Sequence, residues 1–170
     1  MWPQSPETLA KAAAEKNIPY ILSTVSSSSL ERISEVSEGK AWFQLYHPKD
    51  DKLRDDLLKR CENSGIKTLV ILADVPSFGY RNKEIKSGLT VPLRITLNTI
   101  LQVISSPQWA LNTLVHGQPE FKTLKKYMPK GTNIMNLSHF MDQTFNGRLN
   151  EDKIKAIRDK WKGNLVIKGV

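Results

Sequence analysis

The fold of this chain is decided by its last six residues, Leu165-Val166-Ile167-Lys168-Gly169-Val170. Leu165, Val166 and Ile167 form an unbroken apolar run, a pattern typical of a strand that is buried on both faces of a parallel sheet. The run ends in Lys168, and a polar residue at the carboxyl end of a strand is a common active-site element of an α/β barrel. No sequence follows here that could close a barrel, so we expect the chain to be a piece of an enzyme.

Three similar apolar runs lie earlier and alternate with helical patterns. We expect strands at residues 18–22, 41–46, 69–73 and 165–168. We expect helices at residues 6–17, 29–38, 50–64 and 151–161, with Ser5, Asp50 and Asn150 at three of their starts and a capping box of Ser28 and Glu31 at the fourth. This alternation predicts an α/β fold, a parallel sheet covered by helices in a barrel or a doubly wound arrangement.

The composition excludes several classes of function. The net charge of +8 comes from scattered lysines and arginines without a basic block, so we expect no nucleic-acid partner. The single cysteine, Cys61, excludes an internal disulfide framework. The chain has no glycine-rich phosphate loop and no metal-ligand cluster. The isolated histidines are expected to be surface or structural residues; they are His47, His116 and His139.

Polar residues gather where the predicted strands end. Ser23 follows the first strand, Gln44 and Tyr46 alternate with apolar residues in the second, and Lys168 ends the fourth. Because parallel strands end at one edge of a sheet, these four side chains are expected to line one concavity. A structural interpretation stays open for each: Ser23 caps a turn, Tyr46 lies at a rim, and Lys168 pairs with a neighbouring acid.

Four motifs occur in an order that resembles the FMN-dependent 2-hydroxy-acid dehydrogenase/oxidase family, which includes glycolate oxidase, mandelate dehydrogenase and cytochrome-type L-lactate dehydrogenase. The motifs are residues 22–31, Trp42-Phe43-Gln44-Leu45-Tyr46, residues 73–86 with Ala73-Asp74-Val75-Pro76 and Gly79-Tyr80-Arg81, and Val166 to Val170. The resemblance implies a partial TIM (β/α)8 barrel of family strands two to five, with residues 1–170 as one incomplete domain.

The resemblance also assigns roles by position. Ser23 and Gln44 would hydrogen-bond FMN, and Lys168 would lie beside the flavin ring, where its charge favours the anionic reduced form. Tyr46 and Arg81 would hold the 2-hydroxy acid, with the Arg81 fork on its carboxylate. No catalytic residue is expected in this chain, because the family's histidine base and phosphate-binding residues belong to the other half. One departure from the family is Leu72, which stands where a threonine is common.

The insertion at residues 75–149 leaves the carboxyl end of the third strand, and the resemblance makes it an active-site loop. It contains two predicted helical stretches, residues 97–104 and 109–115. Two interpretations remain open. We favour a lid over the site, or a combination of both roles; the alternative is an amphipathic segment at residues 90–116 that contacts a membrane surface.

The resemblance implies an FMN-dependent enzyme that oxidises an L-2-hydroxy acid, similar to L-lactate, to the 2-oxo acid. The resemblance implies a cytoplasmic protein, with peripheral contact at the cytoplasmic face of the inner membrane if the second interpretation of the insertion holds. It also implies a homo-oligomer when the enzyme is complete, whereas this chain alone is expected to be inactive. The alternatives are another flavin- or phosphate-binding TIM-barrel enzyme, or a self-associating half-barrel that serves as an interaction module.

Overall fold

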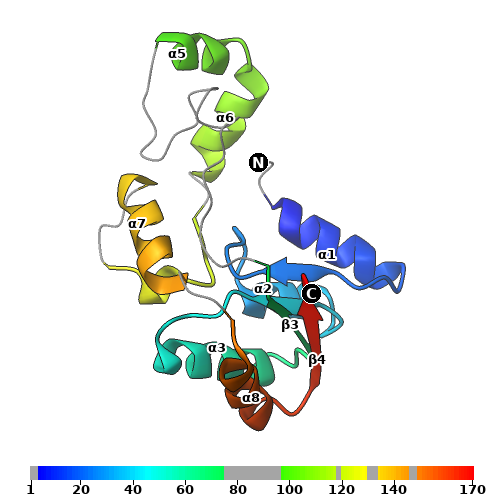
Figure 1. Ribbon diagram of the computed structural model, residues 1–170. Coiled ribbons are helices and arrows are strands. Elements are labelled where there is room, and N and C mark those ends of the chain that lie inside the picture. Colours follow the sequence, from blue (N-terminus) through cyan, green and yellow to red (C-terminus); the bar gives the residue numbers. More distant parts are fainter. Residues whose placement is uncertain (1–3, 75–96, 118–119, 130–133, 146–148) are drawn as a thin grey trace.

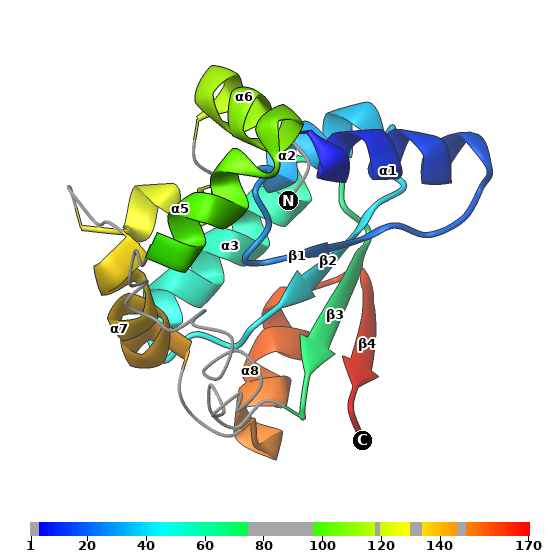
Figure 2. The ribbon, with the colours of Figure 1, turned by 90° about the horizontal axis from the view of Figure 1, so that it is seen from above.

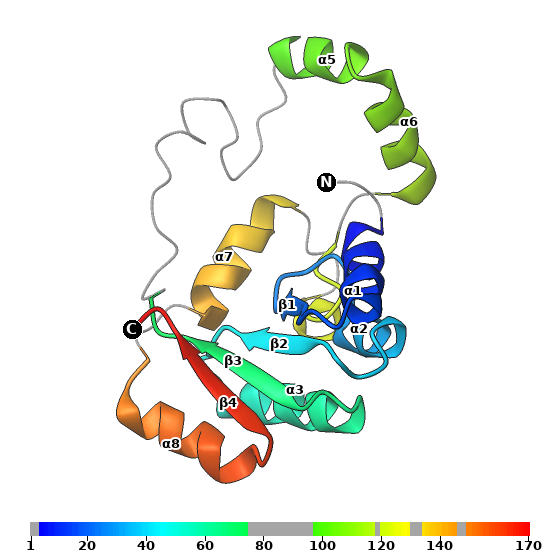
Figure 3. The same cartoon turned by 90° about the vertical axis from the view of Figure 1, so that its right-hand side faces the viewer.

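Four parallel strands lie side by side in the order β1-β2-β3-β4 (Figure 3). The computed structural model describes residues 4–74, 97–117, 120–129, 134–145 and 149–170. The strands are β1 (Ile21–Ser23), β2 (Trp42–Leu45), β3 (Thr68–Leu72) and β4 (Asn164–Lys168). Their register aligns Leu22 with Phe43, Phe43 with Leu69, and Leu69 with Leu165. Strands that follow one another in the chain are therefore neighbours in the sheet, as in an α/β barrel.

Helices flank each strand along the chain. They are α1 (Ser5–Glu15), α2 (Leu30–Val36), α3 (Asp51–Asn63) and α8 (Glu151–Lys160). The predicted caps of α3 and α8 are confirmed, since the side chains of Asp50 and Asn150 accept backbone N–H groups of the first turn. The capping box at Ser28 is wrong: the Ser28 hydroxyl donates to Glu7 on α1 at 2.7 Å, and Ser29 caps α2 instead.

One apolar core lies between the sheet and these helices. Figure 2 shows α3 and α8 beside the strands on one side of the sheet. The strands contribute Leu22, Phe43, Leu45, Leu69 and Ile71 to this core; the helices contribute Ala10, Leu30, Ile33, Leu57, Leu58, Cys61, Ile157 and Trp161. Burial of this set supplies the main driving force for folding, at about 25 cal/mol for each Å² of apolar surface removed from water.

The described part of the insertion forms two separate regions. Its elements are α5 (Leu97–Ile104), α6 (Pro107–His116), the 3-10 turn η1 (Lys125–Tyr127) and α7 (Ile134–Phe145). In Figures 1 and 3, α5 and α6 stand away from the sheet, while α7 lies beside the carboxyl end of β2. A second apolar cluster of Leu124, Met141 and Phe145 fixes residues 120–129 and 134–145 to the strand ends, where it also contacts Tyr46.

The prediction of an α/β fold with a parallel sheet is confirmed, and the four strands lie within a few residues of their expected places. The two helices expected in the insertion are also present as α5 and α6. Helix α7 was not predicted. The expected N-cap of α1 at Ser5 is wrong, because Gln4 occupies that position with a left-handed backbone. None of the helices in the described ranges has the length and apolar character needed to cross a bilayer.

Candidate functional site

The sheet has two faces with different surroundings, because side chains alternate along each strand. Leu22, Phe43 and Leu69 point into the helix-covered core. The opposite face, here called the open face, carries Ser23, Gln44, Val70, Leu72, Val166 and Lys168. On this face Ser23 aligns with Gln44, and Leu72 aligns with Lys168 two residues closer to the carboxyl end.

Ser23 belongs to a turn as well as to the open face. Its carbonyl accepts the Ser26 N–H at 3.0 Å, and its hydroxyl accepts the Val25 N–H at 3.4 Å. A serine side chain that accepts from the backbone two residues later stabilises this kind of turn. The structural interpretation of Ser23 is thus realised, although the hydroxyl keeps its own proton to donate to a ligand.

Gln44 and Tyr46 are held in place by a buried threonine. The Thr24 hydroxyl donates to the Gln44 carbonyl at 2.5 Å and accepts the Tyr46 N–H at 3.1 Å. Thr24 is fully buried, so the two hydrogen bonds of its hydroxyl join the ends of β1 and β2 without competition from water. The half-buried Gln44 carboxamide has no hydrogen-bond partner among the described residues, which leaves two donors and an acceptor available on the open face.

The aromatic ring of Tyr46 lies against the last residue of α7. Its centroid is 6.2 Å from that of Phe145 in an edge-to-face arrangement, a preferred geometry for aromatic pairs. Nearby, the Lys49 N–H donates to the Thr144 carbonyl at 2.8 Å. Backbone and side-chain contacts therefore connect α7 to the carboxyl end of β2, and Tyr46 makes the side-chain contact.

An ion-pair network holds the segment that leads to α7. Arg60 on α3 contacts Glu31 at 2.7 Å, donates to the Thr123 carbonyl at 2.8 Å, and reaches the Tyr127 hydroxyl at 3.2 Å. Although partial burial alone would raise the pKa of Glu31, its hydrogen bond to the Arg60 guanidinium holds that pKa below its usual value. The Tyr127 hydroxyl also donates to Asp56, and burial raises the pKa of Tyr127.

Lys168 pairs with an acid at the end of the neighbouring strand. Its ammonium lies 3.4 Å from a carboxylate oxygen of Asp74, and both side chains are about half exposed. The Ala73 N–H donates to the Lys168 carbonyl at 2.9 Å, so the β3–β4 ladder continues to this point. Gly169 makes the close approach possible: at its φ of +87°, a Cβ atom would lie 2.3 Å from the Asp74 carboxyl carbon.

Leu72 presents an apolar surface beside this pair. It aligns with Lys168 in the register and is only 8% exposed. A leucine side chain cannot donate or accept a hydrogen bond, so β3 offers no polar side chain on the open face beside Lys168. Polar recognition there falls to β1, β2 and β4.

His47 follows Tyr46 directly and is half-buried, with both of its ring nitrogens shielded from solvent. Neither of its ring nitrogens has a partner among the described residues. Burial, together with the positive charges of Lys153 and Arg54, lowers the pKa of His47 to about 4, and the nearby Asp51 only partly offsets this. His47 is therefore neutral at pH 7.

The structure brings most of the predicted residues to one edge. Ser23 and Gln44 are neighbours, while Gln44 and Lys168 are two strands apart, or about 10 Å across and about 7 Å along the sheet. Arg81 lies outside the described residues. Two participants were missed, Thr24 and Asp74. Asp74 directly follows the predicted third strand, and this position is the signal that could have identified it as the partner of Lys168.

The open face offers a distinct set of interactions at the carboxyl ends of the strands. It has the Gln44 carboxamide, which has no partner within the described ranges, a phenol held at its rim by α7, and an ammonium whose ion pair is long and exposed. Exposed pairs of this kind contribute little to stability, so a ligand could take over the ammonium at small cost. The set suits a flat ligand with ring nitrogens and carbonyl oxygens beside a small carboxylic acid.

Comparison with known proteins gives a consistent result. The sequence model of the FMN-dependent dehydrogenase family matches residues 1–170. The chain is 34% identical over 163 residues to an L-lactate dehydrogenase of Pseudomonas syringae pv. syringae (strain B728a), covering 95% of this chain and 43% of that one. It is 35% identical over 164 residues to an L-lactate dehydrogenase of Caulobacter sp. (strain K31), covering 95% and 42%.

The fold is similar to that of a solved (S)-mandelate dehydrogenase described as a monotopic membrane protein. The TM-score is 0.88 at 27% identity, covering 99% of this chain and 44% of that one. A solved mandelate oxidase is similar with a TM-score of 0.66. The prediction of a partial barrel is thereby confirmed. The chain spans less than half the length of the relatives that it matches.

Proposed function

Because this chain belongs to the FMN-dependent dehydrogenase family, we propose that it forms part of an enzyme that oxidises an L-2-hydroxy acid, of the L-lactate kind, to the 2-oxo acid. The relatives named L-lactate dehydrogenase support this substrate class. The family membership also sets aside the alternative of an unrelated flavin- or phosphate-binding barrel. Self-association as an interaction module stays a prediction, as does a homo-oligomeric complete enzyme.

The observation that carries the proposal is the placement of Gln44, Tyr46 and Lys168 on the open face at one end of the strands. The donor set fits FMN, which supplies the two-electron acceptor when bound. The Gln44 carboxamide would hydrogen-bond the ring with groups that have no other described partner. Lys168 would place positive charge where negative charge develops on the ring, and a preorganised charge of this kind stabilises the product of reduction.

The two proposed substrate contacts have different origins. Tyr46 would donate its hydroxyl to the acid from a ring that α7 keeps in position. Arg81 would bind the carboxylate, for which a planar guanidinium is well suited. Ser23 would add one hydroxyl donor to the cofactor, but Leu72 would add none. We therefore propose that cofactor contacts from this chain rest mainly on Gln44 and Lys168.

The experiment is a chimera. This chain replaces the matching segment of the Pseudomonas syringae L-lactate dehydrogenase, and we measure the FMN content and the oxidation of L-lactate, glycolate and (S)-mandelate. We expect bound FMN, with L-lactate reducing it and D-lactate failing to do so. The 170-residue chain alone is expected to show no turnover. A folded, FMN-loaded chimera that oxidises none of the three acids would refute the proposed function.

We further propose that α5 and α6 bind peripherally to a membrane, at the cytoplasmic face of the inner membrane. The large apolar side chains of these helices are exposed, with Leu97, Leu114 and Val115 each near 80%. Residues 97–117 contain no Asp, Glu, Lys or Arg, so burial in lipid meets no charge. An interfacial helix binds in proportion to the apolar area that it buries. The similar (S)-mandelate dehydrogenase is itself described as monotopic.

The lid interpretation of residues 75–149 applies to a different part of the insertion. Residues 120–129 and 134–145 pack at the carboxyl end of β2, with Phe145 against Tyr46. We propose that these two stretches cover the site while α5 and α6 contact lipid. Flotation with neutral phosphatidylcholine vesicles tests the second role: Leu114→Asp should reduce binding, and binding that is unaffected by this change contradicts it.

A further inference from the structure

The guanidinium of Arg60 on α3 uses all three of its nitrogens for contacts. Its Nε and one terminal nitrogen bind the two carboxylate oxygens of Glu31 at 2.7 and 3.0 Å. The other terminal nitrogen donates to the Thr123 carbonyl at 2.8 Å and to the Tyr127 hydroxyl at 3.2 Å. Such a set of contacts requires the planar fork of an arginine, and a lysine could not reproduce it.

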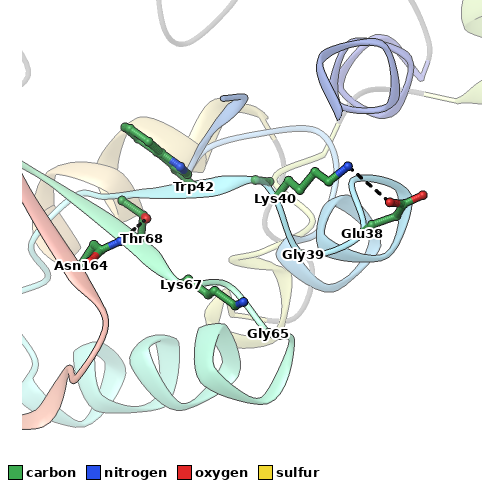
Figure 4. A pocket seen from close by; sticks show the side chains of 9 residues that line it. Glu38, Gly39, Lys40, Trp42, Gly65, Lys67, Thr68 and Asn164 are labelled. Carbon is green, nitrogen blue, oxygen red and sulfur yellow. Dashed lines mark hydrogen bonds and ion pairs between the residues drawn. The ribbon is translucent and has the colours of Figure 1, made fainter. Parts of the chain in front are cut away.

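Burial distinguishes Arg60 from other cations of the chain. Its side chain is only 15% exposed. By contrast, Arg32 pairs with Glu35 at 54% exposure, and Lys40 pairs with Glu38 at the amino ends of the strands at 49% exposure (Figure 4). Exposed pairs contribute little and exchange readily with water, whereas loss of a buried charged donor leaves its partners unsatisfied. Arg60 therefore holds its partners firmly.

Residues 123–127 of the insertion are the segment that Arg60 holds. Thr123 is fully buried, and its hydroxyl donates to the Ser28 carbonyl at 3.4 Å. The Tyr127 hydroxyl donates to Asp56 on α3, and its ring packs against both apolar clusters described above. Both ends of this segment are thus fixed to the helical layer outside the sheet.

Apolar packing connects the segment to the carboxyl end of β2. Leu124 is fully buried and belongs to the same cluster as Phe145, the last residue of α7. Phe145 is itself only 4% exposed and lies edge-to-face against the ring of Tyr46. A closely packed cluster transmits a displacement because it contains little free volume. A shift of the Thr123 backbone would therefore reach the Tyr46 ring.

Arg60 itself lies far from the open face. It is nine residues from Asp51, the first residue of α3, or about 14 Å along the helix axis. Since α3 follows β2 and leads back to the start of the parallel strand β3, its later residues lie toward the amino ends of the strands. At this position Arg60 can act on a substrate only through other residues.

We propose that Arg60 is a positioning residue, which holds the Tyr46 hydroxyl at the place of the 2-hydroxy acid through residues 123–127 and α7. This inference rests on the substrate contact proposed above for Tyr46. A displacement of about 1 Å in a substrate-binding group can cost on the order of a hundredfold in rate, so a remote contact of this kind has a measurable effect. The flavin contacts proposed for Gln44 and Lys168 do not involve this route, and FMN content should stay unchanged.

The first test is a double-mutant cycle in the FMN-loaded chimera. We expect Arg60→Met to lower kcat/KM for L-lactate about tenfold. In the Tyr46→Phe background the same change should lower it by about twofold at most, because the hydroxyl that Arg60 positions is already absent. Arg32→Met, which removes an exposed ion pair of α2, is the matched control and should change nothing in either background.

Tyr127→Phe is a milder variant for the same cycle. It keeps the aromatic ring in both apolar clusters and removes only the hydroxyl, which contacts Arg60 and Asp56. We expect a loss of about threefold in kcat/KM, again only where the Tyr46 hydroxyl is present.

The second test does not depend on turnover. The Lys49 N–H donates to the Thr144 carbonyl, so its hydrogen exchange reports how firmly α7 is held at the end of β2. In the 170-residue chain and in the chimera, Arg60→Met should speed this exchange about tenfold or more. Arg32→Met should leave it unchanged.

Two results would overturn the proposal. The first is an equal loss of kcat/KM from Arg60→Met in both backgrounds, since Arg60 would then act on the fold in general and not through Tyr46. The second is exchange at Lys49 that is unaffected by Arg60→Met. A folded, FMN-loaded chimera that oxidises no acid, but whose Lys49 exchange responds to Arg60→Met, refutes the proposed function alone and leaves Arg60 as the residue that holds α7.

Discussion

Replacing His47 should remove an acid sensitivity that is built into the fold. The pKa of this histidine is about 4 in the folded chain because of burial and the charges of Lys153 and Arg54, against about 6.5 for an unfolded histidine. The unfolded state therefore binds a proton more readily at every pH between these values. His47 therefore has no effect on the free energy of unfolding above pH 6.5. Between pH 6.5 and pH 4 it lowers this free energy progressively, and below pH 4 it causes no further loss.

The magnitude follows from the size of the shift. One pKa unit corresponds to about 1.4 kcal/mol, so a shift of this size has an upper limit of about 3 kcal/mol. The ring is only partly withdrawn from solvent, and screening reduces the effect, so we expect about 1 to 2 kcal/mol. In His47→Leu the pH-dependent loss should disappear. At pH 7.5 this variant should be as stable as the wild type or more stable, because two unpaired buried nitrogens are removed.

The assay is urea unfolding at pH 7.5, 6.5, 5.5 and 4.5 for the wild type, His47→Leu and the control His139→Gln, whose histidine is exposed on α7. Carboxylates titrate in all three proteins, so the difference between them isolates His47. If His47→Leu shows the same pH dependence as the wild type, or if the His47 ring titrates near 6.5 in an NMR experiment, the assignment of this pKa and of its cause is wrong.

Three further predictions concern the open face. Gly169→Ala should destabilise the chain by about 1 to 3 kcal/mol in thermal unfolding, because its Cβ would meet the Asp74 side chain and its φ is positive; an unchanged Tm would contradict the close approach. Lys168→Met in a complete enzyme should remove about 1 to 3 kcal/mol of charge stabilisation from the reduced flavin and so lower its reduction potential, which redox titration measures; an unchanged potential would mean that Lys168 does not lie beside the flavin ring. Tyr46→Phe should leave stability within about 0.5 kcal/mol, because the contact with Phe145 remains, but should lower kcat/KM for L-lactate at least tenfold; equal kinetics would exclude the phenol from substrate binding.

The sheet could be predicted from sequence because its strands are short apolar runs between clear helix signals, such as Asp50 and Asn150. The helix α7 was missed although Leu137, Phe140, Met141 and Phe145 form an apolar stripe at helical spacing. That stripe packs on Tyr46 and residues 120–129, so α7 is stabilised by partners that are distant in the chain.

The site was predicted only in part, for a similar reason. Gln44 and Tyr46 were recognised as open-face residues from their alternation with Phe43 and Leu45. The contact of Lys168 with Asp74 joins residues that are far apart in the chain, and the linkage of Gln44 and Tyr46 through Thr24 depends on the pairing of β1 with β2. The register decides both contacts.

The burial of Cys61 has a practical consequence for labelling. It is the only cysteine of the chain, it is fully buried in the core, and burial raises the pKa of its thiol above the usual value. A thiol of this kind stays protonated and inaccessible in the native state. A cysteine introduced at Trp109 would therefore react alone with a maleimide dye and could report the depth of α6 in a vesicle. Under denaturing conditions Cys61 would become reactive, so the same reagent would also count unfolded molecules.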